Sequence, residues 1–130
     1  MAGFGLIRVL RDDLVAFGGH LIAPCPHQNE CPIPENDWCH FSRRFERSSL
    51  HRRIKSGALG HEDEKFSYVA AAKHPIQPVH TRVLRHPQRH SGHVHMQLCA
   101  GGGLQAVTVT RSDKENWRRA RKTDWGDAWS

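Results

Sequence analysis

The 130-residue chain carries 19 lysines and arginines against 13 acidic residues, a formal charge of +6, and 38% of its residues are hydrophobic. This length suits one domain with a thin core, and no apolar run is long enough to span a bilayer or to mark a secretory signal. We therefore expect a soluble, intracellular protein with a polyanionic partner, in which four cysteines serve as ligands or free thiols more readily than as disulfides.

Residues 4–17 are predicted to form an amphipathic helix. One face carries the apolar residues Leu6, Ile7, Leu10, Leu14 and Phe17, while the opposite face carries Arg8, Arg11, Asp12 and Asp13. Two glycines at 18–19 suit a left-handed stop, and residues 20–23 form a short apolar strand that Pro24 ends. A helix, a stop and a buried strand are typical of an α/β sheet, in which ligands gather beyond the carboxyl ends of strands.

The cysteines begin where that strand ends. Cys25, Cys31 and Cys39 lie within fifteen residues among several prolines, and Cys99 stands alone much later. Four thiolates at one point suit zinc or an iron–sulfur cluster, and the absence of Cys-x2-Cys pairs slightly favours the cluster. The alternative is a set of buried free thiols or two disulfides.

Two histidines lie close to these cysteines in the sequence. His27 and His40 are each within two residues of a thiol. We expect them to donate hydrogen bonds to the ligands rather than to bind the metal themselves.

Residues 40–56 are predicted to form a basic helix between an N-cap at Ser42 and a stop at Gly57. Phe41, Phe45, Leu50 and Ile54 line one side. The cationic residues are Arg43, Arg44, Arg47, Arg52, Arg53 and Lys55. Such a helix can lie along a phosphate backbone, although a solvated basic face explains the same pattern.

The second half of the chain reads mainly as strands. Residues 61–65 are acidic, and we expect a solvated turn that caps or pairs with the arginine helix, in preference to a general base at Glu62, Asp63 or Glu64. Residues 66–72 predict a strand. Alternation over 81–85, 93–98 and 104–110 predicts a three-stranded antiparallel sheet, whose last hairpin at 99–103 presents Cys99.

Four histidines lie in or near this sheet: His86, His90, His93 and His95. Strand alternation places His93 and His95 on one side. Their irregular spacing favours exposed or nucleic-acid-facing imidazoles over a metal site.

The basic tail combines cations with indoles. Its cations are Arg118, Arg119, Arg121 and Lys122, beside Trp117 and Trp125. This combination suits phosphate contact and base stacking in RNA, and a terminal helix with both tryptophans on the core is compatible with it.

Several separated motifs together resemble one family. The runs APCPH, CP and WCHF, the arginine segment, EDEKFSY, LC and RRARKTDWGD occur in this order. They resemble the carboxyl-terminal part of the methyltransferase-like small-ribosomal-subunit proteins of bacteria and mitochondria. The resemblance implies a [4Fe–4S] cluster on Cys25, Cys31, Cys39 and Cys99, and zinc is the alternative from the residues alone.

The resemblance also implies the fold. We expect an α/β to α+β protein: the carboxyl-terminal part of a Rossmann-like class I methyltransferase fold with a cysteine-rich insertion and a small antiparallel sheet. Residues 1–24 would supply a helix and a late strand, 25–60 the cysteine loop and basic helix, 61–112 the strands with the Cys99 hairpin, and 113–130 the tail.

A function follows as an expectation. The resemblance implies an RNA-contacting protein of the small ribosomal subunit or its assembly, acting in translation, with rRNA and an amino-terminal methyltransferase-like segment as partners and no membrane. It would lie in the cytoplasm of a bacterium or in the mitochondrial matrix. The alternatives are a remnant of an S-adenosylmethionine-dependent rRNA methyltransferase and a zinc-stabilised nucleic-acid-binding module. Enzyme activity stays open, and this chain lacks the glycine-rich loop that would hold S-adenosylmethionine.

Overall fold

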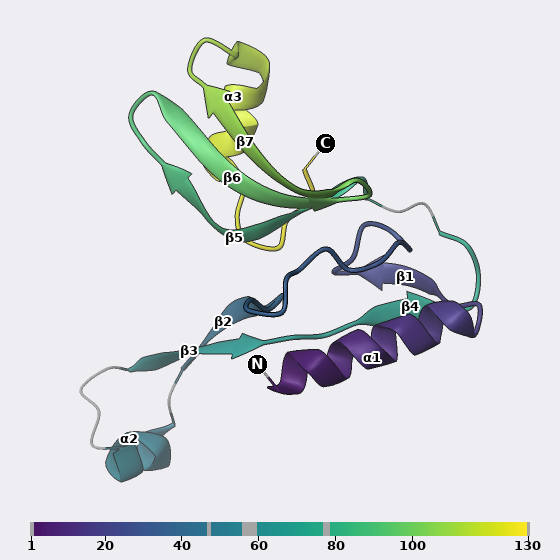
Figure 1. Ribbon diagram of the computed structural model, residues 1–130. Helices are drawn as coiled ribbons and strands as arrows, with labels where there is room; N and C mark the ends of the chain where they lie inside the picture. The colour runs from purple at the N-terminus through teal and green to yellow at the C-terminus, as the bar shows by residue number, and fades with distance from the viewer. Residues whose placement is uncertain (1, 47, 56–59, 77–78, 130) are drawn as a thin grey trace.

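A computed structural model describes residues 2–46, 48–55, 60–76 and 79–129 and shows a mixed α+β fold (Figure 1). In chain order these residues form α1 (Ala2–Ala16), β1 (His20–Ala23), β2 (Phe41–Glu46), α2 (Ser49–Lys55), β3 (His61–Phe66), β4 (Ala70–Ala72), β5 (Thr81–Arg89), β6 (His93–Ala100), β7 (Gly103–Thr110) and α3 (Lys114–Lys122). None of the helices in these described ranges is long and apolar enough to cross a membrane.

The largest sheet is antiparallel, with the strand order β5-β6-β7. The three predicted strands are thus confirmed, and each extends beyond its predicted range. Cys99 lies near the end of β6, opposite Arg82 of β5 and Leu104 of β7. The following turn is tight, and Gly103 has a φ of 117°, which glycine adopts without strain. Cys99 is therefore fixed by two neighbouring strands.

Helix α3 packs on one face of this sheet (Figure 1), and the cysteine segment packs on the other face at the end that carries Leu84 and Cys99. The consecutive residues Val83 and Leu84 are therefore both buried, in different clusters. The α3 cluster contains Val83, Val94, Met96, Leu98, Val109 and Ala120, with Trp117 and Trp129 against it. The cysteine-side cluster contains Phe4, Ile33, Phe41, Leu84 and Cys99, with Trp38 and Trp125 against it.

The chain after α3 returns to the outer edge of β5. The backbone N–H of Val83 donates to Asp127 O at 2.8 Å, and that of Gly126 donates to Val83 O at 2.9 Å. An isolated bridge joins Arg82 to Ala128. Residues 126–128 thereby pair with an edge strand that would otherwise expose unpaired backbone groups.

Helix α1 ends as the glycines predict. Gly18 has a φ of 85°, and its N–H donates to Val15 O at 3.0 Å. At Gly19 a Cβ would lie 2.7 Å from the carbonyl oxygen of Leu14, so the helix end and the start of β1 approach closely. Strand β1 then pairs antiparallel with β4 in a sheet of two strands.

The predicted basic helix over 40–56 is wrong for its first half. Residues 41–46 form β2, which includes the proposed cap Ser42, and only Ser49–Lys55 are helical; Gly57 lies outside the described residues. The reason is cross-strand pairing: β2 runs antiparallel to β3, which sets Arg44 opposite Asp63 and Arg43 opposite Glu64.

The prediction for residues 61–72 is confirmed in part, because the acidic run pairs with the arginine segment through Asp63 and Arg44. The acidic run is strand β3 rather than a solvated turn, and the predicted strand at 66–72 breaks after Phe66 and resumes at β4. Helix α2 lies between β2 and β3, at the end of this hairpin that is far from the rest of the chain (Figure 1).

Helix α3 confirms the interpretation of the tail as a terminal helix whose tryptophans pack on the core. Asp113 caps it by accepting from the side-chain amide of Asn116 at 3.0 Å and from its backbone N–H at 3.1 Å. These bonds lower the pKa of Asp113. The cap is present above the ordinary carboxyl pKa and is lost as the pH falls through the lowered value. Trp117 packs on the sheet, and Trp125 packs on the cysteine side.

Candidate metal centre

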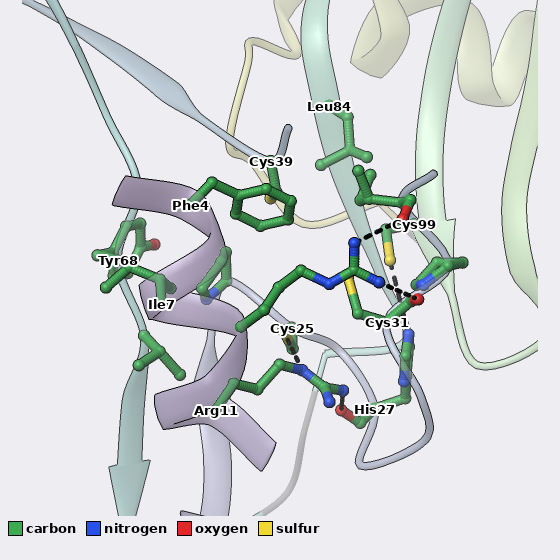
Figure 2. A pocket seen from close by; sticks show the side chains of 15 residues that line it. Phe4, Ile7, Arg11, Cys25, His27, Cys31, Cys39, Tyr68, Leu84 and Cys99 are labelled. Atoms are coloured by element: carbon green, nitrogen blue, oxygen red, sulfur yellow. Dashed lines mark hydrogen bonds between the residues drawn. The ribbon is translucent and has the colours of Figure 1, made fainter. Parts of the chain in front are cut away.

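All four cysteines line one pocket between α1, the cysteine segment and the three-stranded sheet (Figure 2). Cys25 follows β1 directly, Cys31 and Cys39 come from the segment before β2, and Cys99 comes from β6. None of the four forms a disulfide, so the alternative of two disulfides is wrong. The pocket thus brings together thiols that lie far apart in the chain.

The wall of this pocket is mainly apolar. Phe4, Ile7, Ile33 and Leu84 line it beside the sulfur atoms. Phe4, Ile33 and Leu84 are buried, so this side of the pocket is closed to water. A charged group placed here must find its counter-charge in the protein.

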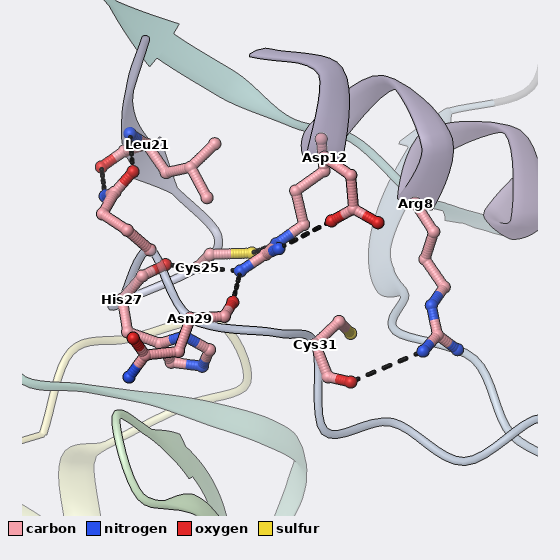
Figure 3. A network of polar contacts seen from close by, with 9 residues as sticks. Arg8, Asp12, Leu21, Cys25, His27, Asn29 and Cys31 are labelled. Carbon is pink, nitrogen blue, oxygen red and sulfur yellow. Dashed lines mark hydrogen bonds and ion pairs between the residues drawn. The ribbon is translucent and has the colours of Figure 1, made fainter. Parts of the chain in front are cut away.

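That counter-charge is the guanidinium of Arg11, which is only 4% exposed. Its Nε donates to Cys25 Sγ at 3.2 Å, and its Nη2 donates to the carbonyl oxygens of His27, at 3.4 Å, and Asn29. It also forms an ion pair with Asp12 at 3.0 Å. Figure 3 shows these contacts between α1 and the cysteine segment.

A second arginine lies one helical turn earlier. Arg8 donates to Ile33 O at 2.9 Å. It also donates to Cys31 O at 3.4 Å (Figure 3). Residues 4, 7, 8 and 11 share one face of α1 because three and four positions make about one turn. This face, rather than the predicted apolar face, covers the pocket.

Most of the predicted apolar face of α1 is exposed, whereas Ile7 of that face lines the pocket. Leu6 is 72% and Phe17 89% exposed, and Leu10 is 47% exposed. The sequence placed Arg8 and Arg11 on the polar face opposite the apolar one, and in the structure these two arginines face the cysteine segment. The physical reason is that the backbone carbonyls and thiols of the cysteine segment offer acceptors that these cations can satisfy, whereas an apolar face would leave them unpaired.

Side chains of the sheet hold the cysteine segment from the other side. Arg82 donates to Pro24 O at 3.0 Å. Arg85, which has a φ of 67° at a bulge in β5, donates to Asp37 Oδ1 at 2.7 Å and to Trp38 O at 2.9 Å. A loop without regular structure is thereby fixed at both ends.

Burial is the main influence on the pKa values of the pocket thiols, and the neighbouring thiols add to it. Burial raises the pKa of Cys39 to about 12, with further contributions from Cys25, Cys31 and Cys99. Burial likewise raises the pKa of Cys99 to about 11. Burial also raises the pKa of Cys25, although the hydrogen bond from Arg11 opposes this. Metal binding at such thiols releases protons, so metal affinity rises with pH.

The two candidate histidines differ in position. His27 lines the pocket, and its Nε2 lies 3.6 Å from Cys99 Sγ. Burial, aided by the charge of Arg11, lowers the pKa of His27 and favours the neutral ring. His40 stacks on Trp38 instead, and its Nδ1 lies 3.0 Å from Trp38 O. Of the two, His27 is the one whose ring nitrogen meets a thiol.

The predicted RNA-binding residues lie in two regions, the segment of β2 and α2 and the helix α3. Arg43 and Arg44 lie exposed on β2, where Arg44 forms an ion pair with Asp63 at 2.8 Å; Arg52, Arg53 and Lys55 belong to α2, and Arg47 lies outside the described residues. On α3, Arg118, Arg121 and Lys122 line a surface hollow with Trp117.

Cations of α3 also lie over tryptophan rings. The guanidinium of Arg119 is 4.7 Å from the ring centre of Trp129, and that of Arg121 is 5.8 Å from the ring centre of Trp117. Such contacts hold the arginine stems against the sheet. The basic side of α3 is therefore a fixed surface that combines cations with an indole.

The fold and the pocket define a small α+β protein with four free thiols around one apolar, arginine-flanked site. Comparison with protein families shows that the chain belongs to the family described as mitochondrial small ribosomal subunit Rsm22, which matches residues 1–130.

The names of similar proteins are consistent with membership of this family. The chain is 31% identical over 114 residues to the human ribosome assembly protein METTL17, mitochondrial, which covers 84% of the chain and 24% of the human protein. It is 29% identical over 133 residues to the mitochondrial Rsm22-cox11 tandem proteins 1 and 2 of Schizosaccharomyces pombe, over 90% of the chain and 16% of each relative. The chain spans about a quarter or less of the length of these relatives.

Proposed function

We propose that this chain is a [4Fe–4S]-bearing, RNA-contacting module that acts in the small ribosomal subunit or its assembly. The single observation that carries the metal part is the convergence of four free thiols on one pocket. Membership of the Rsm22 family supports the ribosomal part. In a eukaryotic cell the proposed compartment is the mitochondrial matrix, since the named relatives are mitochondrial.

The residues of the pocket fit a cluster. Four thiolates are its usual ligands, and the guanidinium groups of Arg8 and Arg11 lie beside the cysteine segment, where their positive charge would offset that of an anionic cluster. The apolar wall formed by Phe4, Ile33 and Leu84 limits access of water, and Arg11 donates to a ligand sulfur. When bound, a cluster would link the cysteine segment to β6 and supply a one-electron redox couple.

The greater length of the relatives bears on the role of α1 and β1. We propose that α1 and β1 belong to a Rossmann-like sheet in the full-length proteins, of which this chain has the carboxyl-terminal part. The antiparallel pairing of β1 with β4 leaves one edge of each strand without a partner among the described strands. Any methyl transfer would need residues outside this chain.

The metal is tested directly by anaerobic purification followed by iron, sulfide and zinc analysis and an absorption spectrum of the same sample. We expect a brown protein with about four irons and about four sulfides per chain. Sulfur donors alone also suit zinc, so a colourless protein with about one zinc per chain would replace the cluster by a zinc site. A protein that contains neither metal after anaerobic preparation would contradict both forms of the proposal.

We also propose that the basic side of α3 contacts rRNA. The double variant Arg118→Ala/Arg121→Ala is expected to lower the affinity for a small-subunit rRNA transcript roughly tenfold. The slope of log affinity against log salt concentration should become shallower by the equivalent of about one to two phosphate contacts. The measurement is filter binding at several salt concentrations.

A control on another surface is Arg44→Ala, because Arg44 is already paired with Asp63. It removes one cation from a different surface, and we expect a change in affinity of less than about threefold. If the double variant keeps the salt dependence of the wild type, α3 does not contact the RNA.

A further inference from the structure

A second cluster of metal-binding side chains lies at the opposite end of β6 from Cys99. His90, His93 and His95 each offer one ring nitrogen, and these atoms lie within 4.8 Å of one another. The ring centres of His90 and His93 are 4.5 Å apart, and those of His93 and His95 are 4.6 Å apart. We propose that these three histidines form a binding site for a divalent transition-metal ion, with Zn²⁺ as the natural candidate.

The hairpin between β5 and β6 holds these residues in place. The N–H of His90 donates to His93 O at 2.8 Å, and the N–H of Arg111 donates to Gly92 O at 3.0 Å. His93 and His95 lie on the same face of β6 because they are two residues apart, and His90 approaches them from the turn. Two ligands on a strand and one on a tight turn need only side-chain rotation to close on an ion.

The distances are compatible with such a rotation. An ion with metal–nitrogen bonds of about 2.1 Å and tetrahedral angles separates its nitrogen ligands by about 3.4 Å. The three nitrogens lie within 4.8 Å, so each must move by about an ångström or less. His90 and His95 are exposed, which leaves room for this movement.

A hydrogen bond from the neighbouring strand orients one of the ligands. His95 Nδ1 lies 2.6 Å from the hydroxyl oxygen of Thr108, its partner on β7. In the tautomer with the proton on Nδ1, this nitrogen donates to Thr108 and the lone pair on Nε2 is left for the ion, as is usual at metal-binding histidines. Three imidazoles suit zinc, copper or nickel and leave a fourth position for water or for a group of a binding partner.

This site is separate from the thiols. Four residues of extended strand place Cys99 about 13 Å from His95 along β6. His86, the fourth histidine of the region, is not part of the cluster, because its ring lies against Trp125 at 4.8 Å and its Nδ1 faces Asp124 at 3.9 Å. His86 therefore provides a matched control.

The experiment is a cobalt titration of the purified full chain followed by displacement with Zn²⁺. We expect one Co²⁺ per chain with visible d–d absorption and without thiolate charge-transfer absorption, because the ligands are nitrogens. The variants His93→Gln and His95→Gln should lose this Co²⁺ with at least a hundredfold drop in affinity, while His86→Gln retains it. Thr108→Val should weaken binding about tenfold.

Circular dichroism and the iron, sulfide and zinc content of each variant before the titration provide the remaining controls. We expect both to match the wild type, so that failure of the histidine site is distinguished from failure of the thiol site. Equal cobalt binding in His93→Gln, His95→Gln and His86→Gln, or cobalt absorption that comes from thiolate ligands alone, would overturn the proposal.

Discussion

Cys99→Ser is expected to remove most of the bound iron and to destabilise the protein by ~3 kcal/mol or more, because metal binding at four converging ligands contributes directly to folding. Cys99 is the ligand that would join the sheet to residues 25–39, and its sulfur is buried against His27. Iron and sulfide analysis with chemical denaturation of the anaerobic protein measures both effects.

Two comparisons make this result specific. Ala100→Ser places a hydroxyl at the next buried position of β6 and should retain the iron. After removal of the metal with a chelator, wild type and Cys99→Ser should differ by only about 1 kcal/mol, since the remaining change is one buried sulfur to oxygen. A Cys99→Ser protein with full iron content would show that Cys99 is not a ligand.

Arg11→Met is expected to lower the free energy of unfolding by roughly 2–4 kcal/mol even without metal. Methionine retains much of the stem volume, but the carbonyl oxygens of His27 and Asn29 lose their donor inside the protein. In the cluster-loaded protein, loss of this positive charge should also make the reduction potential more negative, because the more reduced and more anionic state is stabilised less.

The control for Arg11 is its exposed partner. Asp12→Asn removes the ion pair at 3.0 Å but keeps every contact between Arg11 and the cysteine segment. Because Asp12 is 67% exposed, we expect a change of less than about 1 kcal/mol. Similar losses in both variants would mean that Arg11 acts through Asp12 rather than through the thiol segment.

The sequence predicted correctly those helices and strands whose own residues carry the pattern that forms them. The strands β5, β6 and β7 alternate regularly and are separated by turn residues, and the Gly18 stop of α1 follows from its left-handed backbone. The mixed fold class with a small antiparallel sheet could therefore be predicted. The four cysteines of the pocket could also be named, because their residue type carries the signal and Cys25, Cys31 and Cys39 lie among prolines.

The errors lie where distant residues decide the structure. The arginine segment has helical periodicity, yet Arg43 and Arg44 pair with the acidic residues of β3, and this pairing spans about twenty residues. The direction in which α1 faces depends on the carbonyls of the cysteine segment, so Arg11 was missed. The spacing of Phe4, Ile7, Arg8 and Arg11 on one helix face was the available signal.

The arrangement of the thiols also sets an order in time during synthesis. Cys25, Cys31 and Cys39 leave the ribosome early, whereas Cys99 follows at least about 3 s later at roughly 5–20 residues per second. The strand that borders Cys99 is completed only when residues 126–128 cover β5. Binding of the proposed metal to all four thiols would therefore have to wait until Cys99 has been made, and during this interval the other three thiols lack their fourth partner.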